Sequence, residues 1–509
     1  MTEPRDFSRR EFVAGATAAV AVSAAGTRIA AGIASPASPL TDLGAVEAIA
    51  RMTRGEMSAE RYAEALLVRC GAAKALNAFI TLDPDRVMAD ARARDVERRD
   101  GKPMGALFGL PIPVKDSVNT RDYPTTAGTP ALRHFRPKED APVVASLRAA
   151  GAIVLGKTNL HELSYGWTSN NLAFGAVHNP YDTTRIPGGS SGGTAVAIAA
   201  HLAPLGVAED TEGSIRVPAA LCGLAALRPS TGRYPTKACV PISPLFDQVG
   251  PHARNVADLA LFDAVVANDK APLAAIDLHG LRLGVVRDYW FKGLDADVER
   301  ITANALKRLT DAGVVLVEST LTNLQALIDL ATAQIQNHDV RLSLPRFLQE
   351  YHVGVTLEQV IAQASPDIQS TFKSDVLPGG KNFVTEDIYR TARDKILPQL
   401  HALFRDYFAK QKTDAIVFPA TMVPAPLIGD EDMLNVNGQK VSFTTAISRN
   451  IDPGSTSGLP GLVLPAGLTP GGLPVALEFD GPAGSDRRLL AIGIALERVL
   501  VPVPPPPKI

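Results

Sequence analysis

Apolar segments alternate with helical segments along most of the chain, and this alternation restricts the fold more than any other feature. Strands are predicted at 108–116, 152–155, 281–286, 314–317, 415–418 and 462–464, and helices at 43–52, from Ser58 onward, and at 83–99, 143–150, 194–200 and 295–312. Residues 320–410 read as mostly helical, like a covering layer. Apolar strands separated by helices are typical of an α/β fold with a largely parallel sheet.

The first forty residues are typical of an export signal. Arg9 and Arg10 precede an Ala/Val-rich run over 14–25, a pattern that predicts a twin-arginine signal peptide and linker at 1–40 and a periplasmic or secreted protein. The run is shorter than the roughly 20 residues that span a bilayer, so stable membrane insertion is expected only for an uncleaved signal. The alternative is a helical or unstructured tail that carries two arginines. Residues 41–498 are then one large domain, and 499–509 form a Pro-rich tail.

Charge and cysteine content exclude several classes of protein. The 51 Lys and Arg residues are balanced by 53 Asp and Glu residues, for a net charge of −2, which argues against a nucleic-acid partner. Three cysteines (Cys70, Cys222 and Cys239) are too few for a disulfide scaffold, and neither a CxxC nor an HExxH motif occurs. We therefore predict no metal and no cofactor. The sequence does not fix the oligomeric state, and a homodimer stays open.

Three short segments are candidates for chemistry. They are residues 113–116, which end on Lys115 and Asp116; the Gly/Ser-rich loop 187–193; and residues 210–218. Each is weak alone. The Gly/Ser loop lacks the Gly-Lys-Ser/Thr that closes a phosphate-binding loop. It fits G-x-S-x-G around Ser191, but polar, Pro-broken sequence precedes it where a nucleophile elbow requires an apolar strand.

Taken together and in order, these segments resemble the amidase signature family over roughly residues 42 to 495. The matching stretches are 109–116, 151–159, 188–218 and 472–475, with Ser190 and Ser214 spaced 24 positions apart. The resemblance implies one large domain, with a central mixed, mostly parallel twisted sheet covered by helices on both faces. It places a variable helical layer at about 320–450, and it implies hydrolysis of carboxylic amides.

The resemblance also implies residue roles. Ser214 is the nucleophile that carries the acyl group, Ser190 is a bridging serine held through a cis peptide, and Lys115 is the base. A serine hydroxyl is a poor nucleophile until a base takes its proton. An ordinary lysine is protonated at neutral pH, but burial at the end of an apolar strand disfavours the ammonium form. The backbone N–H groups of Thr211, Glu212, Gly213 and Ser214 are implied as the oxyanion hole.

The chain departs from the family pattern beside these residues. Glu212 stands where the family often has glycine, and Ala208 and Glu209 replace the commoner Gly-Thr. We expect the Glu212 side chain to point to solvent. The other roles are structural or secondary: Ser191, Asp210 and Arg216 as supports of the loops, and Asn170 and Asn171 either as lining of the acyl pocket or as an ordinary loop.

The leading hypothesis is a small-molecule amidase. An esterase or carbamate hydrolase on the same triad is the close alternative, because the same tetrahedral path serves all three bonds. An amidotransferase subunit fits the export signal poorly, since charged tRNA is cytoplasmic. A non-catalytic binding protein is opposed by the joint presence of Lys115, Ser190 and Ser214.

Overall fold

The computed structural model describes residues 39–507. The predicted export signal falls almost entirely on residues before this range, so it lies outside the described residues and stays a prediction. Within the described range no helix combines the length and the apolar character needed to cross a membrane.

A single mixed sheet of eleven strands forms the centre of the described chain, in the order β1-β3-β2-β6-β8-β7-β14-β15-β11-β9-β10. The strands are β1 Phe79–Leu82, β2 Pro111–Lys115, β3 Ile153–Thr158, β6 Leu205–Asp210, β7 Ala225–Arg228, β8 Gln248–Ala253, β9 Arg282–Val285, β10 Val315–Glu318, β11 Ala415–Pro419, β14 Gly461–Leu468 and β15 Pro474–Asp480. Two small hairpins lie apart: β4 Asn170–Asn171 with β5 Gly175–Ala176, and β12 Met433–Val436 with β13 Gln439–Ser442.

The parallel pairs of the sheet form two blocks. One consists of β3, β2 and β6, and the other of β10, β9 and β11. Antiparallel pairs join the strands between them and add β1 at the edge. The predicted mixed sheet is confirmed, with more antiparallel pairing than the helix–strand alternation indicated. The reason is that consecutive strands such as β14 and β15 pair without a crossover helix.

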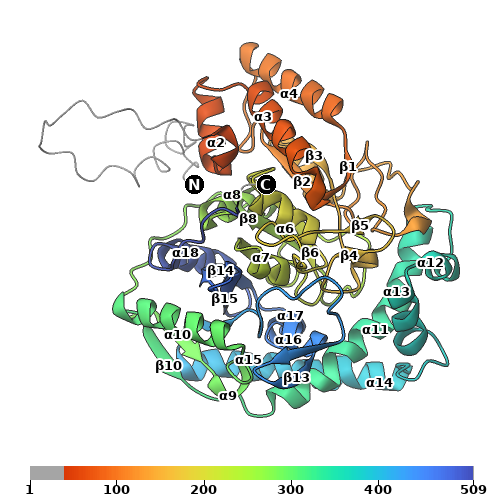
Figure 1. Ribbon diagram of the computed structural model, residues 1–509, viewed down its shortest axis with the longest axis vertical. Helices are drawn as coiled ribbons and strands as arrows, with labels where there is room; N and C mark the ends of the chain where they lie inside the picture. Colours follow the sequence, from red (N-terminus) through yellow and green to blue (C-terminus); the bar gives the residue numbers. More distant parts are fainter. Residues whose placement is uncertain (1–38, 508–509) are drawn as a thin grey trace, which may run out of the picture.

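Helices surround this sheet. They are α2 Ala45–Thr53, α3 Ala59–Ala72, α4 Pro84–Arg99, α5 Pro142–Ala149, α6 Gly192–Ala199, α7 Arg216–Leu221, α8 Val256–Val266, α9 Arg287–Trp290, α10 Ala296–Asp311, α11 Leu324–Glu350, α12 Leu357–Gln363, α13 Pro366–Thr371, α14 Glu386–Thr391, α15 Leu397–Gln411, α16 Phe443–Ser448, α17 Asp452–Ser457 and α18 Asp486–Glu497. Figure 1 shows α2 to α4 gathered at the top of the molecule and α12 to α14 at the lower right. The helical character predicted for 320–410 is confirmed.

Helices cover both faces of the sheet. Gly461 and Leu462 are consecutive in β14, so they face opposite sides. A Cβ on Gly461 would meet Arg216 of α7, whereas Leu462 lies against Gly493 of α18. The sheet is therefore buried on both faces, which explains why the side chains of β2, β6 and β8 are all buried.

Side-chain caps explain where several helices begin. Ser58 accepts from the Arg61 N–H at the start of α3, and Asp83 accepts from the Arg86 N–H at the start of α4. Each cap satisfies an N–H group that has no partner inside the helix. The first turn of α2 is capped from a distance, because both carboxylate oxygens of Asp258 in α8 accept from the N–H groups of Ala45 and Val46.

Candidate active site

Lys115 stands at the carboxyl end of β2, between β3 and β6, and is fully buried. Its Nζ donates to Ser190 Oγ at 2.7 Å, to the backbone carbonyl of Glu209 at 3.2 Å and to Glu209 Oε2 at 2.8 Å. These contacts bring together two of the sequence-predicted residues and a third, Glu209, that had been noted only as a departure from the family pattern. The ammonium or amine of Lys115 therefore joins β2, the Gly/Ser loop and the end of β6.

The Gly/Ser loop holds Ser190 from both sides. The peptide bond between Gly189 and Ser190 is cis. The Ser190 carbonyl accepts from the His161 N–H at 3.1 Å and from Ser169 Oγ at 3.2 Å. Ser191 Oγ donates to the Glu209 carbonyl at 3.0 Å, which ties the loop to β6. Ser190 thus directs its hydroxyl to Lys115, while Ser191 makes a supporting contact.

Ser214 lies in the loop between β6 and α7 and is 5% exposed. The Asp210 carboxylate shapes this loop, because it accepts from the Gly213 N–H at 2.8 Å and from the Ile215 N–H at 3.0 Å. The two bonds flank Ser214 on either side. A Cβ on Gly188 would meet the Pro218 Cα at 2.9 Å, so the Gly/Ser loop packs directly on α7, which follows Ser214.

A fully buried ionic network anchors Asp210. Arg216 Nε lies 3.1 Å from Asp210 Oδ2, Arg228 Nη1 lies 2.7 Å from Asp210 Oδ1, and Arg216 Nη1 lies 2.7 Å from Glu478 Oε1 of β15. Although burial alone would raise it, the two guanidinium groups hold the pKa of Asp210 far below its usual range. These contacts give Asp210 and Arg216 a clear part in fixing the loop that carries Ser214.

The structure corrects the predicted oxyanion hole at Gly213. The N–H of Gly213 is already donated to Asp210 Oδ1, so it does not face a substrate oxygen. Among residues 39–507, no hydrogen bond engages the N–H groups of Thr211, Glu212 and Ser214. Three of the four predicted backbone N–H donors are therefore available to bind a substrate oxygen.

The expectation that Glu212 points to solvent is wrong. Its carboxyl group turns toward the carboxyl group of Asp452 in α17. Burial and the charge of Asp452 raise the pKa of Glu212 well above its usual range, and burial raises the pKa of Asp452 to about 7. Two neighbouring buried carboxyl groups each disfavour the charged form of the other. The Glu212 carbonyl accepts from Trp167 Nε1 at 2.7 Å.

Asn170 and Asn171 occupy different environments. Asn170 Nδ2 donates to Glu431 Oε1 at 2.8 Å. Asn171 is buried, and its amide donates to the carbonyls of Gly128 and Leu160 and accepts from the N–H groups of residues 173 and 174. The Asn171 amide is therefore fully engaged with backbone groups, as in the ordinary-loop alternative.

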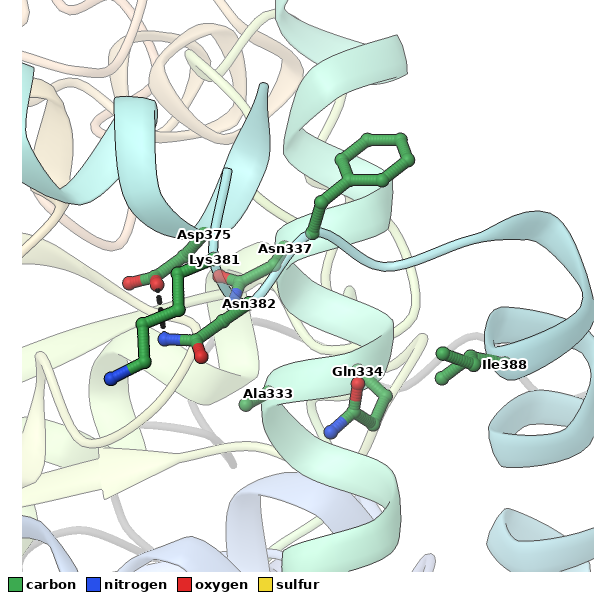
Figure 2. A pocket seen from close by; sticks show the side chains of 8 residues that line it. Ala333, Gln334, Asn337, Asp375, Lys381, Asn382 and Ile388 are labelled. Carbon is green, nitrogen blue, oxygen red and sulfur yellow. Dashed lines mark hydrogen bonds between the residues drawn. The ribbon is translucent and has the colours of Figure 1, made fainter. Parts of the chain in front are cut away.

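A separate hollow of about 490 Å³ lies between α11 and residues 375–388. Figure 2 shows Asn337 and Ala333 of α11 on one side of it and the hydrogen-bonded pair Asp375 and Asn382 nearby. None of Lys115, Ser190 and Ser214 lines it. Over the described part of the chain, no group of three or more His, Cys, Asp or Glu side chains is placed to hold a metal ion.

Close backbone contacts around Gly193, in the first turn of α6, leave no room for a side chain at this position. A Cβ at this position would lie 2.4 Å from the Asn159 carbonyl oxygen and 2.5 Å from the Ala78 carbonyl oxygen. Because neither backbone segment can rotate away, Gly193→Ala is expected to lower the free energy of unfolding by about 1–3 kcal/mol. Urea unfolding monitored by circular dichroism measures the change.

The matched control for that variant is Gly71→Ala in α3. Gly71 is exposed, and its added Cβ would meet nothing within 4 Å. Alanine favours a helix interior over glycine by up to about 1 kcal/mol, so this variant is expected to gain stability. Equal effects of the two substitutions would contradict the close approach at Gly193.

Known proteins resemble the chain over nearly all of its described length. Residues 61–490 match the family model described as Amidase. The chain is 39% identical over 463 residues to an indoleacetamide hydrolase of Agrobacterium vitis, covering 91% of this chain and 97% of that protein. It is 35% identical over 482 residues to a mandelamide hydrolase of Pseudomonas putida, covering 92% and 93%. The solved structure of native peptide amidase from Stenotrophomonas maltophilia matches with a TM-score of 0.74 and 29% identity, covering 92% and 99%.

Proposed function

This chain belongs to the amidase family, and on that premise we propose that it hydrolyses primary amides of aryl-substituted acetic acids, with Ser214 as nucleophile. The names of the indoleacetamide and mandelamide hydrolases each denote a primary amide that carries an aromatic ring. The observation that carries the site assignment is the 2.7 Å contact between Lys115 Nζ and Ser190 Oγ, because it leads from a buried nitrogen base toward the Ser214 loop.

In the acylation step, Ser214 Oγ attacks the amide carbonyl carbon. Its proton passes to Ser190 Oγ, and the Ser190 proton passes to the neutral amine of Lys115 along the 2.7 Å contact. When the tetrahedral intermediate collapses, the C–N bond breaks and the same path returns a proton to the leaving nitrogen, so ammonia departs. Water then attacks the acyl-enzyme by the same route and releases the carboxylic acid.

The tetrahedral intermediate carries a negatively charged oxygen, which is stabilised by hydrogen-bond donors that are already in position before the reaction. The N–H groups of Thr211, Glu212 and Ser214 have no partner within residues 39–507, and Asp210 fixes the loop that presents them. Preset backbone donors stabilise developing charge without reorganisation. The raised pKa values of Glu212 and Asp452 disfavour a second full negative charge beside this loop.

A panel of substrates tests the proposed class. Release of ammonia, amine or alcohol is followed for indoleacetamide, mandelamide, an aliphatic primary amide, and the ester and aryl carbamate with matching acyl groups. We expect kcat/KM for the two aryl amides to exceed that for the aliphatic amide by about tenfold or more, the scale expected for burying one aromatic ring.

Each alternative has its own outcome in this panel. Turnover of the ester or carbamate with no amide hydrolysis would contradict the amidase proposal. Amide hydrolysis without preference for the aryl compounds would remove only the proposed substrate class. A parallel Ser214→Ala protein shows which part of each rate depends on the nucleophile.

A further inference from the structure

Trp167 lies in the segment between β3 and β4 and contacts both loops of the candidate active site. A Cβ on Gly189 would lie 2.8 Å from the Trp167 backbone carbonyl carbon, so the Gly/Ser loop packs directly on this segment, one residue before Ser190. Trp167 Nε1 donates to the Glu212 carbonyl at 2.7 Å, two residues before Ser214. The indole is therefore held beside the two loops that carry the proposed catalytic serines.

Trp167 also remains within reach of solvent at this place. Within residues 151–169, only residues 165–167 are partly exposed, and all the others are buried. The indole N–H is already satisfied by the Glu212 carbonyl, so the part of the side chain that is left to contact a ligand is its apolar ring surface. A partly exposed aromatic ring next to the Ser214 loop is placed to contact a substrate.

We propose that the indole of Trp167 is the wall of the acyl site against which the aromatic ring of the substrate packs, which makes Trp167 a specificity-determining residue. The inference rests on the proposed function and names the residue that selects aryl amides. In an amide of an aryl-substituted acetic acid, a single carbon atom separates the ring from the carbonyl carbon. When Ser214 attacks that carbonyl carbon, the ring has to lie close to the loop whose Glu212 carbonyl holds the indole.

The backbone around Trp167 fixes the place of the indole. Leu163, Ser164 and Ser169 adopt left-handed φ angles of 54°, 59° and 55°. Residues other than glycine rarely do so, and they keep such angles only where the surrounding structure holds them. The Ser169 hydroxyl, for example, donates to the Ser190 carbonyl at 3.2 Å. A wall that is fixed before binding loses little conformational freedom when a ring packs on it.

Tyr165, the other aromatic residue of this exposed stretch, makes different contacts. Its hydroxyl donates to Asn337 Oδ1 of α11 at 2.5 Å, and its ring centroid lies 5.2 Å from that of Phe372. Both contacts join Tyr165 to the helical segment 320–410. Trp167 is the aromatic residue of this stretch whose side chain hydrogen-bonds the Ser214 loop, so the test is directed at Trp167.

The test compares Trp167→Leu with Trp167→Phe. Leucine keeps an apolar side chain but removes the aromatic ring, whereas phenylalanine keeps a ring, and neither has an N–H to hold the Glu212 carbonyl. kcat/KM is measured for phenylacetamide and for butyramide, an aliphatic primary amide. Because the ratio of the two values is taken within one protein sample, an inactive fraction of a variant cancels from it.

We expect the ratio to fall by about fivefold or more in Trp167→Leu, mainly through KM for phenylacetamide, because an aromatic contact and part of the buried apolar area are lost. In Trp167→Phe the ratio should stay within about twofold of the wild type, because a ring is still present. The lost hydrogen bond to the Glu212 carbonyl should lower kcat for both amides by a similar factor in both variants.

Two results would overturn the inference. One is an unchanged ratio in Trp167→Leu. The other is an equal fall in both variants, since it would assign the effect to the hydrogen bond and not to the ring. The matched control is Phe291→Leu, which removes another partly exposed ring, at the end of α9, where Arg287 Cζ lies 5.1 Å from the ring centroid. This control should leave the ratio in place.

A binding measurement decides the case in which the variants turn over too slowly to assay. The chain has two tryptophans, and Trp290 is fully buried and stacked on Phe418. In Ser214→Ala, phenylacetamide is expected to change the tryptophan emission, and this response should vanish in the double variant Trp167→Phe, Ser214→Ala. Binding of phenylacetamide seen by calorimetry with no change in emission would refute the wall.

Failure of the inference and failure of the proposed function give different results. Hydrolysis that persists in Ser214→Ala, with Trp167 intact, would refute the proposed function. A Ser214-dependent preference for phenylacetamide that survives in Trp167→Leu would refute only the role of Trp167.

Discussion

Replacing Ser214 with alanine is expected to lower kcat for amide hydrolysis by about 10⁴-fold or more, with little change in stability. The nucleophile of a catalytic unit is nearly as costly to remove as the whole unit. The Ser214 hydroxyl makes no hydrogen bond within residues 39–507, so its loss leaves no buried group unpaired. Single-turnover measurements with indoleacetamide, alongside a thermal unfolding curve, separate the chemical effect from a folding defect.

Lys115→Ala and Ser190→Ala are expected to lose activity on a comparable scale, because the three residues act as one unit. The matched serine control is Ser146→Ala in α5, whose hydroxyl only donates to the Pro142 carbonyl one turn earlier. It should retain wild-type kcat. Activity of Ser214→Ala within tenfold of the wild type would exclude Ser214 as the nucleophile.

Asp210→Asn is expected to lower the free energy of unfolding by about 3–5 kcal/mol, because it leaves buried arginines without a compensating charge. Arg216 and Arg228 both contact Asp210 and are fully buried. Urea unfolding at pH 7 measures the loss. The control is Asp182→Asn, since the Asp182–Arg185 pair is partly exposed and such a pair contributes less than about 1 kcal/mol.

The same variant has a defined pH signature. The folded pKa of Asp210 is lower than in the unfolded chain, so its contribution to stability is complete above the unfolded value of about 3.9 and is lost as the pH falls below that value. Wild-type stability should therefore decline more steeply below about pH 4 than that of Asp210→Asn. Parallel acid profiles would show that Asp210 is not held in its charged form by the two arginines.

The candidate site divides into a part that was predictable and a part that was not. Lys115, Ser190 and Ser214 were proposed because the segments that carry them resemble, in order, the motifs of the amidase signature family. Asp247 and Asp452 were not identified, because no local pattern marks them. They reach Thr211 and Glu212 from 36 and 240 positions away, through the packing of β8 and α17 against the loop that carries Ser214.

Glu209 is the intermediate case. The sequence marked it as a departure from the family pattern, but its neighbour across the sheet, Lys115, is 94 positions away. The expected orientation of Glu212 was wrong for the same reason. A carboxylate next to a site of developing negative charge is expected to face solvent. Asp452 gives it an inward partner instead.

The strands show a similar division. Those with continuous apolar runs, such as β3 and β11, were predicted, whereas β6 and β8 carry Gly, Pro, His or acidic residues. These become strands only through pairing inside a sheet covered on both faces.

The sequence by itself determined the α/β class, because local periodicity is carried by neighbouring residues. Its motifs also showed the family resemblance, and that resemblance implied the three residues of the proposed triad. Only the tertiary structure decided which strands run antiparallel, which oxyanion donors stay available, and how the Lys115, Glu209 and Glu212 side chains are paired. Those outcomes depend on burial and charge contributed by segments far apart in the chain, and a buried ionisable group takes its protonation state from the neighbours that folding brings to it.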